Sequence, residues 1–468
     1  MRFCVSLCLA RRAGPVCDLS LLLAAGWMLV GAEPVWLQVD FSKPDGQWQM
    51  PALALGQGGL QGDPMIEPHI KEVRQLRPRS LRLFLSEYYR IYPDHDTYDW
   101  TKLDRELRAV RATGARPALA LAMKPPVLYP TVDHFLVHPN NYEEWERLCE
   151  ALARHCRESG FDVAVYEVGN EPDIGESGGT PHFFQSAADY NRFYTHTVTG
   201  LLRGDPEAQV GGPAVASADS FLVEGLIEHC ARQGVPLHVL SWHLYSDSPA
   251  VHAGNIAKQR ARLARFPQLQ GVKLFISEWN MDLMRPNLAP GFQPCFVLET
   301  MRRYAEAGLD MAAYYHIRDC FVDPAEFDWM SPGGRRFMAH WWNVMPQYSA
   351  LFDHHGRVRP AWYAFRLLGQ LEGPRYEVRG ERGGIRALAG DGDGYKHLIV
   401  WRYEDGGPEE VEVRLEVDGA GGRNSRVVQL DAAAPVNNLK VLHFGRSDDL
   451  AQVTLRLGPW DVRWVEIE

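Results

Sequence analysis

VAVYEVG, at residues 163–169, is a short and almost wholly apolar run that ends directly at Asn170, Glu171 and Pro172. A strand buried on both faces has this composition, because every side chain meets apolar neighbours whichever way it points. The amide, the carboxylate and the proline that follow mark the place where such a strand ends. We therefore interpret this run as a buried parallel strand that is followed by polar side chains at its carboxyl end.

Seven further apolar runs occur between Pro51 and Asp319, each followed by amphipathic sequence typical of a helix. They are ALALG (52–56), LRLFLSE (81–87), RPALALAM (116–123), AQVGGPAV (208–215), VLSWHLY (239–245), KLFISEW (273–279) and MAAYYHI (311–317). Apolar strands that alternate with helices predict a parallel sheet covered on both faces. Eight such units predict an α/β fold, the (β/α)₈ TIM barrel; a doubly wound open sheet is the alternative.

The character of the sequence changes after Gly373-Pro374. From Tyr376 on, short runs alternate apolar and polar residues, and turns rich in Gly and Asp separate them, as in GDGDG and DGAGG. This pattern predicts an antiparallel β-sandwich as an accessory domain. The predicted domains are a signal peptide (1–32), an N-terminal segment (33–46), the barrel (47–372) and the sandwich (373–468).

The first 32 residues have the pattern of a secretory signal peptide. Three arginines among the first 12 residues precede a mostly apolar run at 19–30, which is too short to span a bilayer, and Val30-Gly31-Ala32 offers small residues for cleavage. We predict a secreted or periplasmic protein, which would be cytoplasmic if this segment is not cleaved. No later run reaches about 18 uncharged apolar residues, so we expect no membrane span.

The composition narrows the classes of partner. The net charge is −10 and no stripe of Lys or Arg offsets it, which argues against nucleic acid. The 14 Trp and 18 Tyr suit a sugar-binding cleft, although core packing is the commoner use of aromatic rings. Both uses stay open for the adjacent pair Trp341-Trp342. The cysteines beyond residue 32 show no C-x-x-C spacing, which predicts free buried thiols: Cys149, Cys156, Cys230, Cys295 and Cys320.

Catalytic groups of a barrel gather at the carboxyl ends of its strands. The polar residues at the predicted strand ends are Arg82, Glu87, Lys124, Asn170, Glu171, His243, Tyr245, Glu278, Asn280, His316, Arg318 and Asp319. Glu171 at the fourth strand and Glu278 at the seventh would face each other across the barrel mouth, which suits glycoside cleavage by one protonated and one ionised carboxyl. A separation of about 5–5.5 Å between them would indicate retention, and about 6.5–9.5 Å inversion.

Asn170-Glu171-Pro172 together with ISEWN at 276–280 resembles the barrel glycosidases that carry catalytic glutamates on strands 4 and 7. Within that clan the chain most resembles glycoside hydrolase family 39, the β-xylosidases and α-L-iduronidases. VDFSKPDGQW near the N-terminus, MKPPVLYP after the third strand, SWHLY at the sixth and RPAWYAFRLLGQL are similar to the family as well. The resemblance covers almost the whole chain after residue 32, and it implies that the strand near 35–41 joins the sandwich.

The resemblance implies Glu171 as general acid/base and Glu278 as nucleophile of a retaining, β-xylosidase-like exo-glycosidase. It also implies that Asn170 binds the sugar 2-hydroxyl, that Tyr245 holds the Glu278 carboxylate and that His243 lines the same pocket. From the residues alone, His243 is almost as readily a core histidine. Arg82 would either brace the glutamates or contact sugar.

The sequence also departs from the family. Gly169 stands where a tryptophan is usual, Tyr315 replaces the tryptophan platform of strand 8, and Lys124 stands where an apolar residue is common. Asp319 matches a family aspartate and is a candidate substrate ligand. Lys124 and Arg318 could receive the carboxylate of a uronic acid, so an α-L-iduronidase-like uronide hydrolase is one alternative function.

A second alternative is a catalytically idle carbohydrate-binding barrel, in which these departures have cost the activity. A metal-dependent hydrolase is not favoured, because no H-x-H motif stands at a strand end. We therefore expect a glycoside, oligosaccharide or polysaccharide as substrate, with no cofactor and no metal. The sequence leaves a homo-oligomer open.

Overall fold

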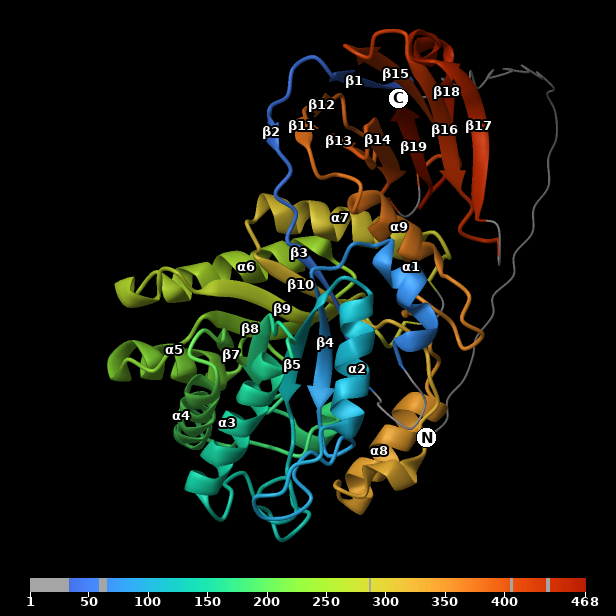
Figure 1. Cartoon of the computed structure of the whole chain (residues 1–468). Helices are drawn as coiled ribbons and strands as arrows, with labels where there is room; N and C mark the ends of the chain where they lie inside the picture. Colours follow the sequence, from blue (N-terminus) through green and yellow to red (C-terminus); the bar gives the residue numbers. More distant parts are fainter. Residues whose placement is uncertain (1–32, 59–64, 286–287, 405–406, 435–437) are drawn as a thin grey trace, which may run out of the picture. The chain divides into compact units, whose positions relative to one another are not determined.

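The computed structural model describes residues 33–58, 65–285, 288–404, 407–434 and 438–468 (Figure 1). The predicted signal peptide, residues 1–32, lies outside the described residues, so its cleavage and the export of the protein stay predictions. No helix in the described ranges combines the length and apolar character needed to cross a membrane.

Eight parallel strands close into a barrel in the order β10-β3-β4-β5-β6-β7-β8-β9 (Figure 1). They are β3 (Ala52–Gln57), β4 (Ser80–Leu85), β5 (Arg116–Leu121), β6 (Val165–Val168), β7 (Val210–Val215), β8 (Val239–Tyr245), β9 (Lys273–Asn280) and β10 (Met311–Tyr315). β10 pairs with β3 as well as with β9, which closes the ring. The predicted barrel is confirmed, and the open sheet is wrong.

The barrel strands are apolar on both faces because both faces are covered. One apolar cluster takes residues from six strands around the ring and fills the barrel interior: Ala54, Ala118, Val165, Val239, Phe275 and Ala313. The alternate side chains, such as Leu55, Leu119 and Leu240, belong to the larger core that includes the helices. This double burial explains why the strands read as continuous apolar runs rather than as alternating ones.

Helices pack around this barrel. The α-helices of the described residues are α1 (Ile70–Arg74), α2 (Thr101–Ala112), α3 (Tyr142–Glu158), α4 (Ala187–Gly204), α5 (Phe221–Gln233), α6 (Pro249–Leu263), α7 (Phe292–Glu306), α8 (Pro332–Asn343) and α9 (Pro360–Leu368). The 3₁₀ turns among the described barrel residues are η1 (Glu67–His69), η2 (Gly175–Gly178), η3 (Pro267–Leu269) and η4 (Pro324–Phe327), and a further one, η5 (Ser447–Gln452), lies between two strands of the sandwich. The Asn141 side chain caps α3 by accepting from the backbone N–H groups of Glu143 and Glu144.

The connection from β10 to α9 is long, and it contains η4 and α8. In Figure 1, α8 lies beyond the end of the barrel toward which the arrows of β4 and β5 point. This is the carboxyl end of the strands, where barrel enzymes place their active sites. The segment that includes Trp341-Trp342 is therefore positioned to shape a site rather than to cover the outside of the barrel.

Two further sheets form a sandwich around an apolar core of their own. The first has the order β12 (Val378–Arg379), β1 (Val35–Asp40), β15 (Val411–Asp418) and β18 (Thr454–Leu457). The second has the order β17 (Leu439–Arg446), β16 (Asn424–Leu430), β19 (Val462–Ile467), β14 (Tyr395–Arg402), β13 (Ile385–Gly392), β11 (Pro374–Tyr376) and β2 (Gly46–Gln47).

One pairing differs from the predicted antiparallel arrangement, because β1 runs parallel to β15, with Val35 opposite Val413 and Asp40 opposite Asp418. Neighbouring strands of a hairpin must be antiparallel, whereas a strand that arrives from a distant part of the chain can join in either direction. The residue limits of the domains stay predictions.

Candidate active site

The carboxyl ends of four barrel strands bring together six of the predicted site residues. Arg82 lies in β4, His243 and Tyr245 lie in β8, Glu278 lies in β9, and Asn170 and Glu171 directly follow β6. His243 and Glu278 are direct neighbours across the β8–β9 pairing. All of them are buried except Glu171 and Tyr245, which are partly exposed.

Arg82 is the centre of the polar network and has no exposed surface. Its Nε donates to Oε2 of Glu167 at 2.6 Å, one Nη donates to Oε1 of Glu278 at 2.8 Å, and the other donates to Oδ1 of Asn170 at 2.9 Å. A guanidinium fixed by three acceptors acts as a rigid counter-charge. Of the two roles that the sequence left open for Arg82, the geometry favours bracing the glutamates.

Two donors hold the carboxylate of Glu278. Besides Arg82 at Oε1, the Tyr245 hydroxyl donates to Oε2 at 2.6 Å. Burial raises the pKa of Glu278, while the Arg82 charge and the Tyr245 hydrogen bond oppose that rise. The carboxyl group of Glu278 is therefore ionised more readily than that of Glu171, which has no such donors from Arg82 and Tyr245.

His243 is fully buried between a cation and a carboxyl group. Its Nε2 lies 3.4 Å from an Nη of Arg82, and its Nδ1 lies 2.9 Å from Oε1 of Glu171. Burial and the Arg82 charge hold the pKa of His243 well below its usual range, so the ring is neutral. Because Arg82 can only donate, Nε2 is the acceptor and the Nδ1–H donates to Glu171.

Glu171 has the surroundings of an acid rather than of an anion. Burial, and then the nearby Glu278 charge, raise its pKa well above the ordinary value. Its backbone adopts φ +40° and its N–H donates to the carbonyl of Ala214 at 2.8 Å. A left-handed conformation is unusual for a glutamate and is typical of functional positions held by their surroundings.

Gly169, which replaces the tryptophan usual in the family, has φ +101°. A Cβ at this position would meet Pro172 and Pro213 only at ordinary contact distances, from 3.6 Å. The glycine is therefore explained by its backbone conformation rather than by a lack of space.

The two glutamates are close enough to act on one sugar. One oxygen of Glu171, one ring nitrogen of His243 and one oxygen of Glu278 all lie within 4.8 Å of one another. Such a trio has the chemistry of a metal site. The guanidinium of Arg82, 2.8 Å from Glu278, already supplies a positive charge at this place, which disfavours a second cation.

A cavity of about 290 Å³ opens over the pair. Its wall contains four predicted site residues: Glu171, Glu278, Tyr245 and Tyr315. The other lining residues are Gly58, Phe84, Ser86, Ala122, Ser177, Gly178, Gly179, Asp282, Leu283, Met284, Phe327, Trp329, Phe337, Met338, Trp341 and Trp342. Asn170, His243 and Arg82 are absent from this wall and contact its carboxyl groups or their neighbours from behind.

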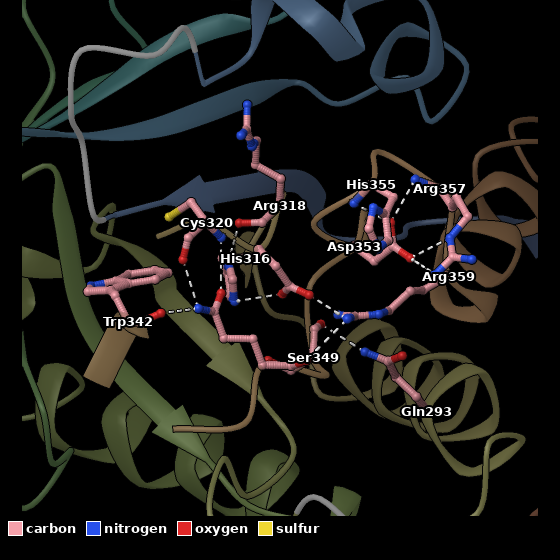
Figure 2. A network of polar contacts seen from close by, with 12 residues as sticks. Gln293, His316, Arg318, Cys320, Trp342, Ser349, Asp353, His355, Arg357 and Arg359 are labelled. Carbon is pink, nitrogen blue, oxygen red and sulfur yellow. Dashed lines mark hydrogen bonds and ion pairs between the residues drawn. The ribbon is translucent and has the colours of Figure 1, made fainter. Parts of the chain in front are cut away.

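Three predicted substrate ligands are not brought to this cavity. The Lys124 ammonium donates to the backbone carbonyls of Asp133 and Pro181. Asp319 is fully buried, and its carboxylate binds the guanidinium of Arg359. In Figure 2 the Arg318 side chain points away from His316 and Trp342, and Arg318 does not line the cavity. The geometry gives no support to a uronate site formed by Lys124 and Arg318.

The sequence reasoning missed most of the cavity wall. Gly178, in η2, lies so close to Glu171 that a Cβ there would stand 2.7 Å from the Cβ of Glu171. Phe327, Trp329 and Met338 come from η4, α8 and the segment between them, where no strand period marks them. The only sequence signal was the Trp341-Trp342 pair, and both of these residues line the cavity.

Comparison with known proteins gives a consistent result. The profile of "Glycosyl hydrolases family 39" matches residues 65–290. A β-xylosidase of Caldicellulosiruptor saccharolyticus is 26% identical over 310 residues, which is 61% of this chain and 59% of that protein. The alignment thus spans less than two thirds of that relative.

Two solved structures share the fold over most of the chain. A family 39 glycoside hydrolase from Xanthomonas axonopodis pv. citri has a TM-score of 0.73 at 18% identity, over 93% of this chain and 97% of that one. A monomeric β-xylosidase from Caulobacter crescentus has a TM-score of 0.72 at 18% identity, over 93% and 99%.

Proposed function

Because the chain belongs to glycoside hydrolase family 39, we propose that it is a retaining glycosidase that hydrolyses β-xylosides or related neutral glycosides. The observation that carries the proposal is the unequal setting of two adjacent carboxyl groups. Glu278 is held by Arg82 and Tyr245, whereas Glu171 has burial and a neighbouring negative charge. One group is thus suited to attack and the other to donate a proton.

In the first step the ionised Glu278 attacks the anomeric carbon and Glu171 donates its proton to the departing glycosidic oxygen. A covalent glycosyl ester to Glu278 forms as the bond to the aglycone breaks. His243 donates its Nδ1–H to Oε1 of Glu171 at 2.9 Å, which leaves Oε2 to carry the transferred proton.

In the second step Glu171, now a carboxylate, takes a proton from water, and the hydroxide attacks the anomeric carbon and releases Glu278. Retention of configuration follows from the two displacements. The proximity of the two groups, with an oxygen of each within 4.8 Å, supports this route, because inversion needs about 6.5–9.5 Å to admit water beside the sugar.

The charges of the cavity favour a neutral sugar. Among the described residues that line it, the charged side chains are Glu171, Glu278 and Asp282, and all three are acidic. A uronic acid would meet carboxylates here without a lining cation, so the iduronidase-like alternative is disfavoured. The β-xylosidase among the relatives supports a β-xyloside as the first substrate to test.

The test uses a panel of aryl glycosides, with NMR of the first-released anomer. We expect retention, and we expect Glu171→Gln and Glu278→Gln to lower kcat at least about a hundredfold, whereas Glu143→Gln on the exposed surface of α3 leaves it unchanged. Azide should rescue Glu278→Gly with formation of an α-glycosyl azide, and Glu171→Ala with a β-glycosyl azide. Binding without hydrolysis across the panel would instead indicate the idle carbohydrate-binding barrel.

A further inference from the structure

We propose that the cavity beside Glu171 holds a flat, apolar aglycone, so that the preferred substrates are glycosides of aryl or polycyclic alcohols rather than unsubstituted oligosaccharides. This inference rests on the proposed hydrolysis and adds the class of leaving group. It follows from where the apolar wall lies relative to the acid, from its composition, and from how it is held.

The apolar wall lies on the leaving-group side of the site. Glu171 donates its proton to the oxygen that bears the aglycone, and η2 packs directly against this carboxyl group through Gly178. The next residue, Gly179, faces α8, since a Cβ there would stand 3.0 Å from the sulfur of Met338. An aglycone that leaves past Glu171 therefore meets the inner face of α8.

The composition of this wall fits an apolar group. Phe337 and Trp341 stack with ring centroids 6.1 Å apart and planes inclined by 17°, and both line the cavity. Phe327 and Trp329 form a second aromatic pair at 5.8 Å. The aliphatic side chain of Leu283 and the thioether of Met338 line the same cavity. Aromatic rings bind sugars as well, but flexible thioether and aliphatic side chains satisfy no sugar hydroxyl.

Polar side chains are few around this space. Apart from the glutamates and Tyr245, the described lining residues with hydroxyl or carboxyl groups are Ser86, Ser177, Asp282 and Tyr315. A second sugar unit would leave several hydroxyl groups facing apolar side chains, at the cost of their hydrogen bonds to water. An aryl group has no such cost, and it gains from the burial of its surface.

Polar groups on the outer side hold the wall in place. Glu176 of η2 holds the N-terminal residue before α8, because its carboxylate accepts from the backbone N–H of Ser331 at 2.7 Å and from the Ser331 hydroxyl. In Figure 2, Trp342 lies beside a bonded cluster in which Gln347 accepts from the N–H of Cys320 at 3.0 Å and donates to the carbonyl oxygens of Cys320 and Trp342. A wall fixed in advance loses little entropy when it binds a ligand.

The experiment compares methyl, benzyl and naphthylmethyl glycosides of the sugar that the panel selects, together with the corresponding disaccharide. The methyl, benzyl and naphthylmethyl compounds release primary alcohols of similar acidity, so these three leaving groups differ mainly in apolar surface, whereas the disaccharide releases a polyhydroxylated sugar. We expect kcat/KM for the naphthylmethyl glycoside to exceed those for the methyl glycoside and the disaccharide by at least about tenfold. Equal values, or a faster disaccharide, would overturn the proposal.

Two variants locate the effect. Trp341→Ala, and independently Phe337→Ala, should lower kcat/KM for the naphthylmethyl glycoside by about tenfold and that for the methyl glycoside by less than about twofold. Trp36→Ala is the matched control, because Trp36 is exposed on β1 of the sandwich. An equal loss on both glycosides in both variants would mean that the wall has only a structural role.

Binding separates this inference from the proposed hydrolysis. Methyl and naphthylmethyl thioglycosides resist cleavage, so calorimetry measures their affinity even if the protein hydrolyses nothing. Tighter binding of the naphthylmethyl compound by about tenfold or more, lost in Trp341→Ala, supports the apolar site whatever the catalytic outcome. Equal affinities would contradict the apolar site, and they would leave the glycosidase proposal standing.

Discussion

The backbone of Gly178 lies against the carboxyl group of Glu171, and a Cβ at residue 178 would stand 2.7 Å from the Cβ of Glu171. The position of the proposed acid, Glu171, therefore depends on Gly178, a residue that has no side chain and takes no part in the reaction. Gly178→Ala should displace Glu171 and lower kcat/KM for glycosides with poor leaving groups by about a hundredfold.

The leaving group makes the test of Gly178→Ala specific. Dinitrophenyl glycosides need little protonation, so their kcat/KM should fall much less in the same variant. The matched control is Gly254→Ala in α6, where a Cβ would meet nothing within 4 Å. Equal losses on both substrates would contradict a role for Gly178 in placing the acid.

Tyr245→Phe should change the pH dependence of catalysis. The Tyr245 hydroxyl lowers the pKa of Glu278, so its removal raises that pKa, and a higher pH is needed to ionise the proposed nucleophile. The acidic limb of the kcat/KM profile should therefore move to higher pH. Tyr395→Phe, on the exposed surface of β14, should leave the profile unchanged. An acidic limb that stays in place would show that another group sets it.

Arg82→Met should destabilise the fold as well as end catalysis. The variant leaves Glu167 and Glu278 buried without the guanidinium that now lies 2.6 and 2.8 Å away. We expect the free energy of unfolding at neutral pH to fall by about 3–5 kcal/mol in urea titrations.

The destabilisation by Arg82→Met should depend on pH. Burial raises the folded-state pKa of Glu278 and the Arg82 charge opposes that rise, so without Arg82 part of the lost stability should return as the pH falls and Glu278 takes up a proton. Arg105→Met removes an exposed partner of Glu67 and should change little. A deficit that is the same at acidic and neutral pH would contradict this explanation.

Chelators should leave the activity unchanged. Glu171, His243 and Glu278 could in principle hold a cation, but Arg82 already provides the positive charge beside Glu278. We expect kcat and KM of the purified protein to be the same before and after dialysis against EDTA, and added zinc to produce no increase. Loss of activity on dialysis that zinc restores would assign a metal to this trio.

The sequence predicted the barrel well because burial on both faces leaves a strong signal. The eight predicted runs contain every residue of the eight observed strands except Gln57 of β3, Ser80 of β4 and Asn280 of β9. The parallel β1–β15 pairing could not be predicted in this way, because strand direction between distant segments has no local signature.

The surroundings of the site were harder to predict than its carboxyl groups. The residues at the strand ends could be found from the sequence, but the direction of their side chains could not. The Lys124 ammonium donates to two backbone carbonyls, and the Asp319 carboxylate binds Arg359. The wall from α8 depends on how a long connection folds back over the barrel. Neither hydrophobic period nor motif encodes that path, and the pair Trp341-Trp342 was the only hint.

The parallel pairing of β1 with β15 has a consequence for how the protein is made. Residues 35–40 leave the ribosome long before their partners at 413–418, so β1 cannot pair with β15 until the barrel has been synthesised. Val35, Leu37 and Val39 are buried in the finished sandwich and would be exposed during that interval. Sandwich formation thus depends on a late contact between distant segments, and a chaperone that shields the nascent β1 should raise the yield of folded protein.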